Sequence, residues 1–169
     1  MQEYAVTRRH TVVLSLWALA GLTLANPSLA NTSSNLTKGN YVLPSAIALA
    51  DEIAAAVAQG RPLVVMVSLP GCPFCHVVRN SYLAPLARDG LASIVQVDMG
   101  SAAKMRDAKG QSITQAQMIK NWGIRLAPTL LFMAQGGREV AERLVGGDSS
   151  GFYGAYLDER LQLASKALS

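Results

Sequence analysis

The chain has 169 residues, 50% of them hydrophobic, and a formal net charge of +4 at neutral pH. This length suits one ordinary domain, and the apolar content is sufficient for a core. No dense run of lysine or arginine accompanies the mildly basic charge, so the sequence does not indicate a nucleic-acid partner. Only two cysteines are present, Cys72 and Cys75. They are too few for a disulfide scaffold, and any thiol chemistry must take place there.

Residues 1–30 have the features of a secretory signal peptide. Arg8 and Arg9 precede an apolar run from Thr11 to Ala25, which is shorter than the roughly 20 residues that a membrane span needs. The segment 28–30 fits the small-x-small cleavage rule, so we predict cleavage at its end. An uncleaved membrane anchor is the alternative, which the short run disfavours. Export predicts an oxidising, periplasmic location, where a lone cysteine pair is more typical of an active site than of a structural one.

The segment 31–43 is predicted to be a flexible leader, because most of it is polar and rich in Asn, Ser and Thr. The folded domain is then predicted to span residues 44–169. A helix is expected to begin at Pro44 or Ser45 and to end at Gly60. Its apolar side chains recur every four residues on one face: Leu49, Ile53 and Val57.

The apolar run from Leu63 to Val67 predicts a strand buried on both faces, because it is short and rich in valine. A Pro-Gly pair ends it. Pro73 suits the first turn of a helix, which places Cys72 at the helix N-terminus. Unpaired backbone N–H groups there favour a thiolate, so Cys72 is the predicted attacking thiol. Cys75, one turn later, is the predicted resolving thiol.

The segment after the cysteines predicts a βαβ unit. The helix from Pro73 is expected to run to about Leu83, and Ala84-Pro85 to end or kink it. Its sheet-facing side chains are expected to be Val77, Val78 and Leu83. A second strand follows at residues 94–97, and a strand–helix–strand unit requires parallel, right-handed pairing.

The remaining segments predict two helices and a hairpin. Residues 100–110 are polar and read as a surface excursion, followed by a helix that ends near Trp122. Strands at 129–133 and 139–145 flank a Gln-Gly-Gly turn typical of a hairpin. The expected caps of the two helices are Ser112 or Thr114, and Ser149 or Ser150. The expected inward residues are Ile113, Gln117 or Met118, and Trp122 in the first helix, and Tyr153, Leu157, Leu161, Ala164 and Leu168 in the second.

The motif Cys72-Pro73-Phe74-Cys75-His76 fits two chemistries. It reads as a dithiol redox site, or as a c-type haem attachment site with His76 as axial ligand. The preceding buried strand and the later hairpin favour the redox site, because a haem site needs neither and a four-stranded core leaves little room for a haem. A zinc site needs further ligands, and His76 is the only histidine left after signal removal, so no metal is predicted.

A second motif resembles a known family. The segment from Trp122 to Phe132 resembles the thioredoxin family segment around its cis-proline, and Gly136 to Val140 resembles that family's hairpin. With the dithiol, the resemblance covers roughly Leu63 to Leu168. It implies a thioredoxin fold, an α/β fold with a central four-stranded mixed sheet flanked by helices. The number of residues between Asp98 and Pro128 in the sequence exceeds that of a minimal thioredoxin. This difference implies a short helical insertion before the cis-proline.

The resemblance also implies the roles of the site residues. Cys72 forms a mixed disulfide with a partner and Cys75 resolves it, while the Ala127–Pro128 bond is cis and Pro128 lies beside the dithiol. A cis-proline exposes neighbouring backbone groups, so that a substrate peptide can pair there as an added strand. The residues implied in substrate binding are Pro73, Phe74, Ala127 and Thr129.

Two departures from the family affect the expected chemistry. Thioredoxins carry a buried acid where this chain has Met66. The usual proton acceptor is therefore missing, and His76 is a candidate proton relay, with water as the alternative. The Pro-Phe dipeptide is that of glutaredoxins, yet Gly146-Gly147-Asp148 lies too far past Pro128 to be their glutathione-binding element. Glutathione is therefore not expected.

These observations predict a periplasmic thiol–disulfide oxidoreductase without a cofactor, expected as a monomer. Resemblance favours a reductase that acts on client proteins with cysteines or disulfides and is supplied by a membrane thiol donor. The alternatives are a c-type haem electron-transfer protein and a redox-inactive thioredoxin-like binding module. The reduction potential, which decides the direction of electron flow, does not follow from the sequence.

Overall fold

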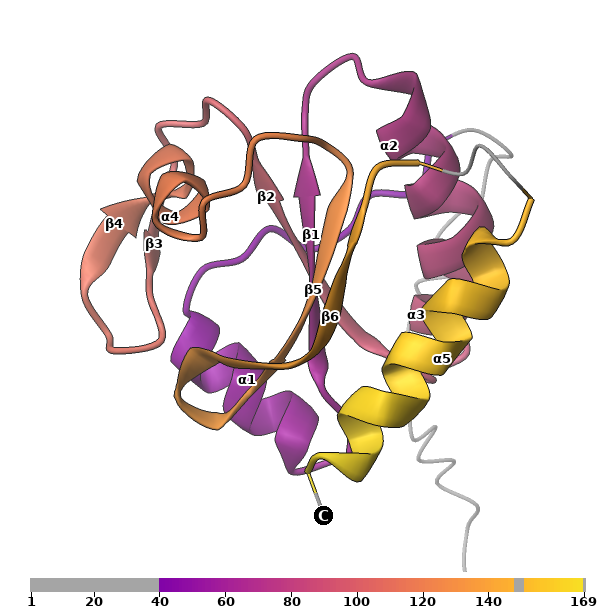
Figure 1. Cartoon of the computed structure of the whole chain (residues 1–169). Coiled ribbons are helices and arrows are strands. Elements are labelled where there is room, and N and C mark those ends of the chain that lie inside the picture. Colours follow the sequence, from indigo (N-terminus) through magenta and orange to yellow (C-terminus); the bar gives the residue numbers. More distant parts are fainter. Residues whose placement is uncertain (1–39, 148–150, 169) are drawn as a thin grey trace, which may run out of the picture. The chain divides into compact units, whose positions relative to one another are not determined.

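The computed structural model describes residues 40–147 and 151–168, and its centre is a four-stranded mixed sheet (Figure 1). The strand order is β2-β1-β5-β6. β1 pairs in parallel with β2 and antiparallel with β5, and β5 pairs antiparallel with β6. A four-stranded mixed sheet is what the family resemblance implies, and the parallel pair of β1 with β2 and the hairpin of β5 with β6 are the pairings that the sequence predicts. The strands are β1 Leu63–Ser68, β2 Ser93–Asp98, β5 Thr129–Ala134 and β6 Arg138–Val145.

Strand β1 is buried along its whole length because both faces of the sheet are covered. Successive side chains of a strand point to opposite faces. Val65 and Val67 therefore belong to one core, and Val64 and Met66 to the other. This double burial explains why the segment is an uninterrupted apolar run rather than an alternating one.

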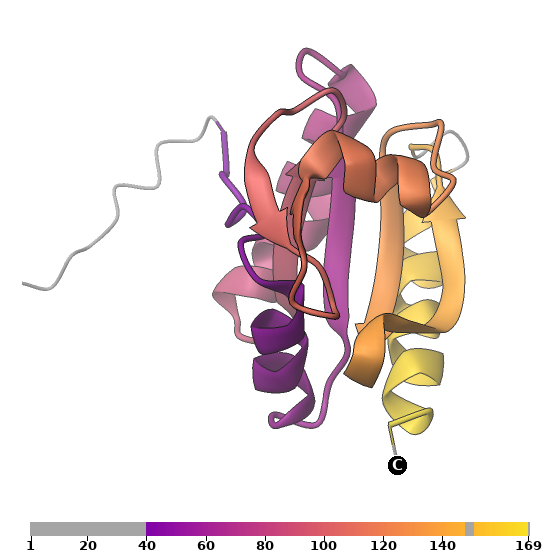
Figure 2. The ribbon, with the colours of Figure 1, turned by 90° about the vertical axis from the view of Figure 1, so that its left-hand side faces the viewer.

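The first core lies under α1 (Leu49–Val57), α4 (Gln115–Asn121) and the small sheet of β3 (Lys104–Arg106) and β4 (Ser112–Thr114). Figure 2 views the protein from this side, with these elements in front of the strands. Their buried apolar side chains are Leu49, Ile53, Ala56, Met105 and Ile119.

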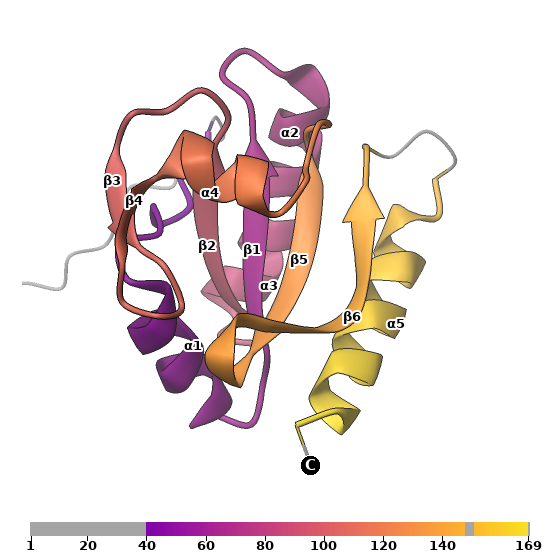
Figure 3. The same cartoon turned by 60° about the vertical axis from the view of Figure 1, so that its left-hand side comes forward.

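The second core lies under a continuous helical run and the last helix. The run consists of α2 (Pro73–Val77), the π-helix η1 (Val78–Leu83) and α3 (Ala84–Arg88), and the last helix is α5 (Tyr153–Lys166). Figure 3 shows α4 in front of the sheet and α3 behind it. The helical side chains buried in this core are Cys75, Val78, Leu83, Tyr153, Leu157 and Ala164.

Helix α1 begins at Leu49, later than the predicted Pro44 or Ser45. The residues before it form isolated bridges to strands instead, since Ser45 bridges Gln96 in β2 and Ala48 bridges Arg106 in β3. The predicted end near Gly60 agrees with the structure, in which the helix is capped at Ala58.

The sequence predicts that the helix after the cysteines ends or kinks at Ala84-Pro85, close to Leu83. In the structure it does not end there. The chain stays helical to Arg88, with a π-helical segment ahead of Pro85. Pro85 lies in the first turn of α3, where a missing N–H is tolerated. Val78 and Leu83 are buried as expected, whereas Val77 is 44% exposed and does not face the sheet.

The segment between β2 and β5 contains the expected helix α4 and also the unpredicted pair β3–β4. Its polar composition concealed Met105, which is buried. Thr114 caps α4 in a capping box with Gln117, so Gln117 is exposed rather than inward. The N-cap of α5 is Phe152, so the prediction of Ser149 or Ser150 as its cap is wrong; both serines lie outside the described residues. The predicted signal peptide and most of the predicted leader also lie outside them.

None of the helices within residues 40–147 and 151–168 is both long enough and apolar enough to cross a membrane.

Candidate functional site

Cys72 and Cys75 form a disulfide at the N-terminus of α2, with their Cα atoms 5.3 Å apart. After β1, the chain turns through Gly71, whose φ of +74° is readily adopted only by glycine. Cys72 is the N-cap of α2, and its Sγ accepts a hydrogen bond from the Cys75 backbone N–H at 3.1 Å. Pro73 begins the helix, as the sequence predicts. A helix N-terminus favours negative charge on the capping sulfur once the disulfide is reduced.

The two sulfur-bearing residues differ in access to solvent. Cys75 is 1% exposed and packs in the second core, whereas Cys72 is only partly buried and lines an open pocket. A thiol or disulfide arriving from outside therefore meets Cys72 first. This asymmetry is the one that an attacking and a resolving cysteine require.

The loop before β5 lies beside this disulfide, at the same end of the sheet as α2 (Figures 1 and 3). The Cys72 Sγ is 3.8 Å from the carbonyl oxygen of Ala127, and the Ala127–Pro128 peptide bond is cis. The Pro128 carbonyl accepts a hydrogen bond from the Gly146 N–H at 2.8 Å. The fold thus brings Cys72, Ala127 and Pro128 together from segments far apart in the chain.

Thr129 and Phe74, both implied in substrate binding, have different surroundings. Thr129 is buried, and its hydroxyl donates to the Leu126 carbonyl at 2.8 Å, so its side chain braces the loop. Phe74 is 55% exposed. It lies against Gly147, where an added Cβ would come within 2.7 Å of the Phe74 ring and Cβ. Phe74 therefore presents an apolar surface next to the disulfide, and Thr129 does not.

Sequence reasoning missed two exposed apolar residues near the site. Leu126, next to Ala127, is 62% exposed, and Val145, which pairs with Thr129, is 60% exposed. Both read as ordinary loop and strand residues. Their position adjoining the cis-proline loop is the only signal that could have identified them.

His76 is exposed, and both of its ring nitrogens have asparagine partners. Nε2 contacts Asn40 Oδ1, and Nδ1 lies 2.9 Å from the Asn80 side-chain nitrogen. A relay role therefore requires one asparagine to release the ring. The missing family acid has no substitute at its own position, because Met66 is fully buried in the same core as Cys75.

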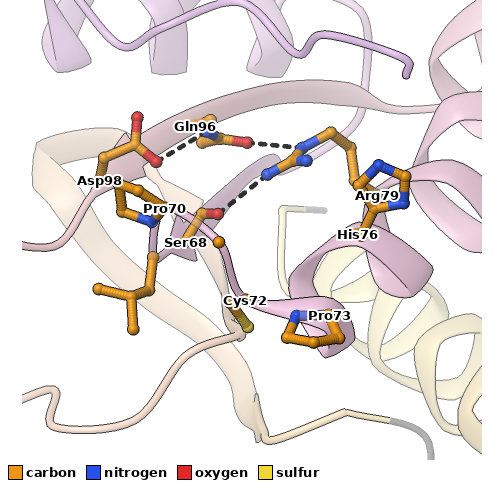
Figure 4. A pocket seen from close by; sticks show the side chains of 10 residues that line it. Ser68, Pro70, Cys72, Pro73, His76, Arg79, Gln96 and Asp98 are labelled. Carbon is orange, nitrogen blue, oxygen red and sulfur yellow. Dashed lines mark hydrogen bonds between the residues drawn. The ribbon is translucent and has the colours of Figure 1, made fainter. Parts of the chain in front are cut away.

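Sequence reasoning also missed a polar network beside the disulfide (Figure 4). Arg79 donates to Gln96 and Ser68, and Gln96 donates to Asp98. Asp98 is the last residue of strand β2 and was interpreted from the sequence only as the end of that strand. A buried serine beside the cysteine motif was the available signal, because a buried hydroxyl needs a partner.

The haem and metal alternatives gain no support from the arrangement of these groups. The disulfide engages both sulfurs that a covalent haem would use, and the His76 nitrogens are both partnered. Among the residues that the structure describes, no three of the His, Cys, Asp and Glu side chains form a group that could hold a metal ion.

A family model described as a thioredoxin-like domain matches residues 49–159, more than half of the chain. The Fasciola hepatica thioredoxin structure is 17% identical, covers 71% of this chain and 97% of its own, and has a TM-score of 0.47. The structure of the periplasmic thioredoxin SoxS from Paracoccus pantotrophus, in reduced form, is 19% identical. It covers 60% of this chain and 96% of its own, with a TM-score of 0.40. A search of curated proteins found no match. Of these comparisons, only the match to the family model shows to which family the chain belongs.

Proposed function

Because the chain belongs to the thioredoxin-like family, whose fold it has, we propose that it is a periplasmic thiol–disulfide oxidoreductase that works as a reductase of client proteins. One observation carries this proposal: the partly exposed Cys72 caps α2 and lies 3.8 Å from the Ala127 carbonyl oxygen, while its disulfide partner Cys75 is buried. The disulfide in this fold supports thiol–disulfide exchange in general. The location, the clients and the direction of electron flow are the proposed part.

The exchange proceeds in two balanced steps. The Cys72 thiolate attacks a client disulfide, so a Cys72–client disulfide forms and one client thiolate leaves. The Cys75 thiolate then attacks Cys72 Sγ and releases the second client thiolate, which takes up a proton. The client disulfide is reduced by two electrons, and the protein is left with the Cys72–Cys75 disulfide. A membrane thiol donor supplies two electrons to restore the dithiol.

Client recognition rests on backbone and apolar contacts around the sulfur. The cis-proline loop offers the Ala127 backbone next to Cys72, where an extended peptide can pair as an added strand. The exposed side chains of Phe74, Leu126 and Val145 provide apolar surface for the flanking residues of the client. Such recognition is tolerant of sequence, which suits several clients.

A trapping experiment tests the assigned roles. Cys75→Ser should accumulate a mixed disulfide with a disulfide-bonded protein, because the resolving thiol is gone, whereas Cys72→Ser should trap none. Insulin reduction by dithiothreitol, followed by turbidity, should fall to the protein-free background with Cys72→Ser. Turnover that persists with Cys72→Ser would instead favour the redox-inactive binding module.

The direction of electron flow is tested by the reduction potential of the Cys72–Cys75 couple, measured against glutathione. A reductase should lie near the thioredoxin value of about −270 mV, and a value near the strong-oxidant end of about −120 mV would reverse the direction. The haem alternative has its own readout, because a Soret band in protein purified from an exporting host would replace this proposal.

A further inference from the structure

An open pocket of about 410 Å³ adjoins the disulfide, and Ala127 and Pro128 of the cis-proline loop are not among the residues that line it. It lies between the ends of β1 and β2 and the start of α2, and Cys72 forms part of its wall (Figure 4). Its polar lining consists of Ser68, His76, Arg79, Gln96 and Asp98. The proposed exchange of disulfides with client proteins uses none of these groups.

Arg79 presents an oriented positive charge to this pocket. Its Nε donates to Gln96 Oε1 and its Nη2 donates to Ser68 Oγ, both at 2.9 Å. Both acceptors are neutral, and within residues 40–147 and 151–168 Arg79 forms no ion pair with a carboxylate and its Nη1 has no protein partner. A fixed guanidinium with unused donors matches the geometry of a carboxylate.

Asp98 presents a negative charge to the same pocket. Its Oδ1 accepts a hydrogen bond from Gln96 Nε2 at 2.8 Å, and its backbone N–H donates to the buried Gln115 at 2.8 Å. The neutral Gln96 amide lies between Asp98 and Arg79 (Figure 4), so the two charges do not neutralise each other in a direct pair. The pocket therefore displays one cation and one anion beside a reactive sulfur.

We propose that this pocket binds the zwitterionic end of a small amino-acid thiol or its disulfide, of which cystine is the simplest. The α-carboxylate binds Arg79, the α-ammonium binds Asp98, and the substrate sulfur reaches Cys72. This inference rests on the proposed function and adds a second substrate class to the same dithiol.

The reaction balances without a further reactant. The reduced Cys72 thiolate attacks cystine, which forms a Cys72–cysteine disulfide and releases one cysteine thiolate. Cys75 then attacks Cys72 Sγ and releases the second cysteine. Cystine gains two electrons and two protons, and the protein dithiol becomes the disulfide. The reverse reaction oxidises two cysteines to cystine.

The first test needs only the reduced full-length chain. Stopped-flow rates are measured with cystine, with the dicarboxylate dithiodiglycolate, with the diamine cystamine and with the neutral hydroxyethyl disulfide. Each rate is divided by that of the same disulfide with dithiothreitol, which corrects for intrinsic reactivity. Charge-assisted hydrogen bonds predict a normalised rate for cystine at least about tenfold above that for hydroxyethyl disulfide. Equal normalised rates overturn the proposal.

The second test assigns the preference to the two charges. Arg79→Gln should lower the normalised ratio of cystine to hydroxyethyl disulfide about tenfold, and Asp98→Asn should lower it independently. Arg88→Gln removes an arginine at the end of α3 and should leave the ratio unchanged. A cystine preference that survives in both pocket variants overturns the proposal. Where a variant does not fold, the normalised rates of the wild-type chain in the first test decide between the outcomes.

The two proposals fail in different ways. If the chain shows no preference for cystine but still reduces insulin in a Cys72-dependent way, only the proposal of a small-molecule substrate is overturned. Absence of exchange at Cys72 with every disulfide removes the proposed function as well.

Discussion

Gly147 lies where the loop after β6 passes the side chain of Phe74. A Cβ at this position would lie 2.7 Å from the Phe74 Cβ and Cδ1. The Phe74 Cβ cannot move by rotation about χ1, so a side chain at position 147 requires a backbone shift, either at position 147 or at the start of α2. The close approach therefore couples the loop after β6 to the residues between the two cysteines.

We predict that Gly147→Ala destabilises the protein by about 1–3 kcal/mol, because the added methyl group overpacks the contact with Phe74. Insulin reduction should also slow, since Phe74 adjoins the disulfide. Urea unfolding and the turbidity assay measure the two effects.

The matched control for this substitution is Gly154→Ala in α5. A Cβ there meets Tyr82 at an ordinary 3.4 Å, and alanine is favoured over glycine in a helix by roughly 0.5–1 kcal/mol. The control should therefore be neutral or stabilising. Equal losses in both variants would remove the Phe74 contact as the cause.

At the scale of elements, Arg143 forms a half-buried ion pair with Glu139 in its own strand, β6, and also links that strand to the end of α4. Arg143 donates to both Glu139 oxygens, at 2.7 and 2.5 Å, and its Nη1 donates to the Trp122 carbonyl at 2.7 Å. The hydrogen bonds that Arg143 donates to the Glu139 carboxylate raise the pKa of Arg143, whereas burial of the guanidinium acts to lower it. Because the folded pKa is the higher one, the contribution of Arg143 is complete at neutral pH and is lost only as pH rises through that pKa.

We predict that Glu139→Gln lowers the free energy of unfolding by about 1–2 kcal/mol, because it removes the charged acceptor from a half-buried guanidinium. Glu142→Gln on the same strand should cost below about 0.5 kcal/mol. It breaks the pair with Arg160, in which the Glu142 side chain is 79% exposed. Urea unfolding of both variants measures the difference, and similar losses would show that burial does not decide the strength of these pairs.

At the scale of the whole molecule, the folded domain includes residues that precede residue 44. Leu43 is 4% exposed and belongs to the second core. The Tyr41 backbone N–H donates to Asn80 Oδ1 at 2.9 Å, on the helical run after the cysteines. Residues 41–43 therefore support the helix that carries the site, although the sequence places them at the end of the predicted leader.

We predict that a chain beginning at Asn40 unfolds at a higher urea concentration than a chain beginning at Pro44. A chain beginning at Pro44 should lose about 2–4 kcal/mol, because the burial of Leu43 and the hydrogen bond of Tyr41 disappear. Unfolding followed by circular dichroism compares the two chains. Equal midpoints would instead place the start of the domain at residue 44, as the sequence suggests.

Local sequence was sufficient for the elements that carry the cysteines. The buried run of β1 and Pro73 at the start of α2 are strong signals, because they depend on neighbouring residues alone. Local sequence was insufficient where contacts with distant segments override the local preference of the chain. Ser45 pairs with Gln96 instead of starting α1, and the helical run continues past Pro85 because its apolar face is covered by the sheet and α5.

The amino-acid sequence by itself determined that the only thiols lie at a helix N-terminus after a buried strand, since spacing and proline chemistry act over a few residues. The approach of Ala127 to Cys72, separated by 55 residues, was expected only from family resemblance. Tertiary structure alone decided the pocket in which Arg79 and Asp98 flank Cys72. Such contacts between distant side chains follow from how the covered sheet faces pack, and no local pattern encodes them.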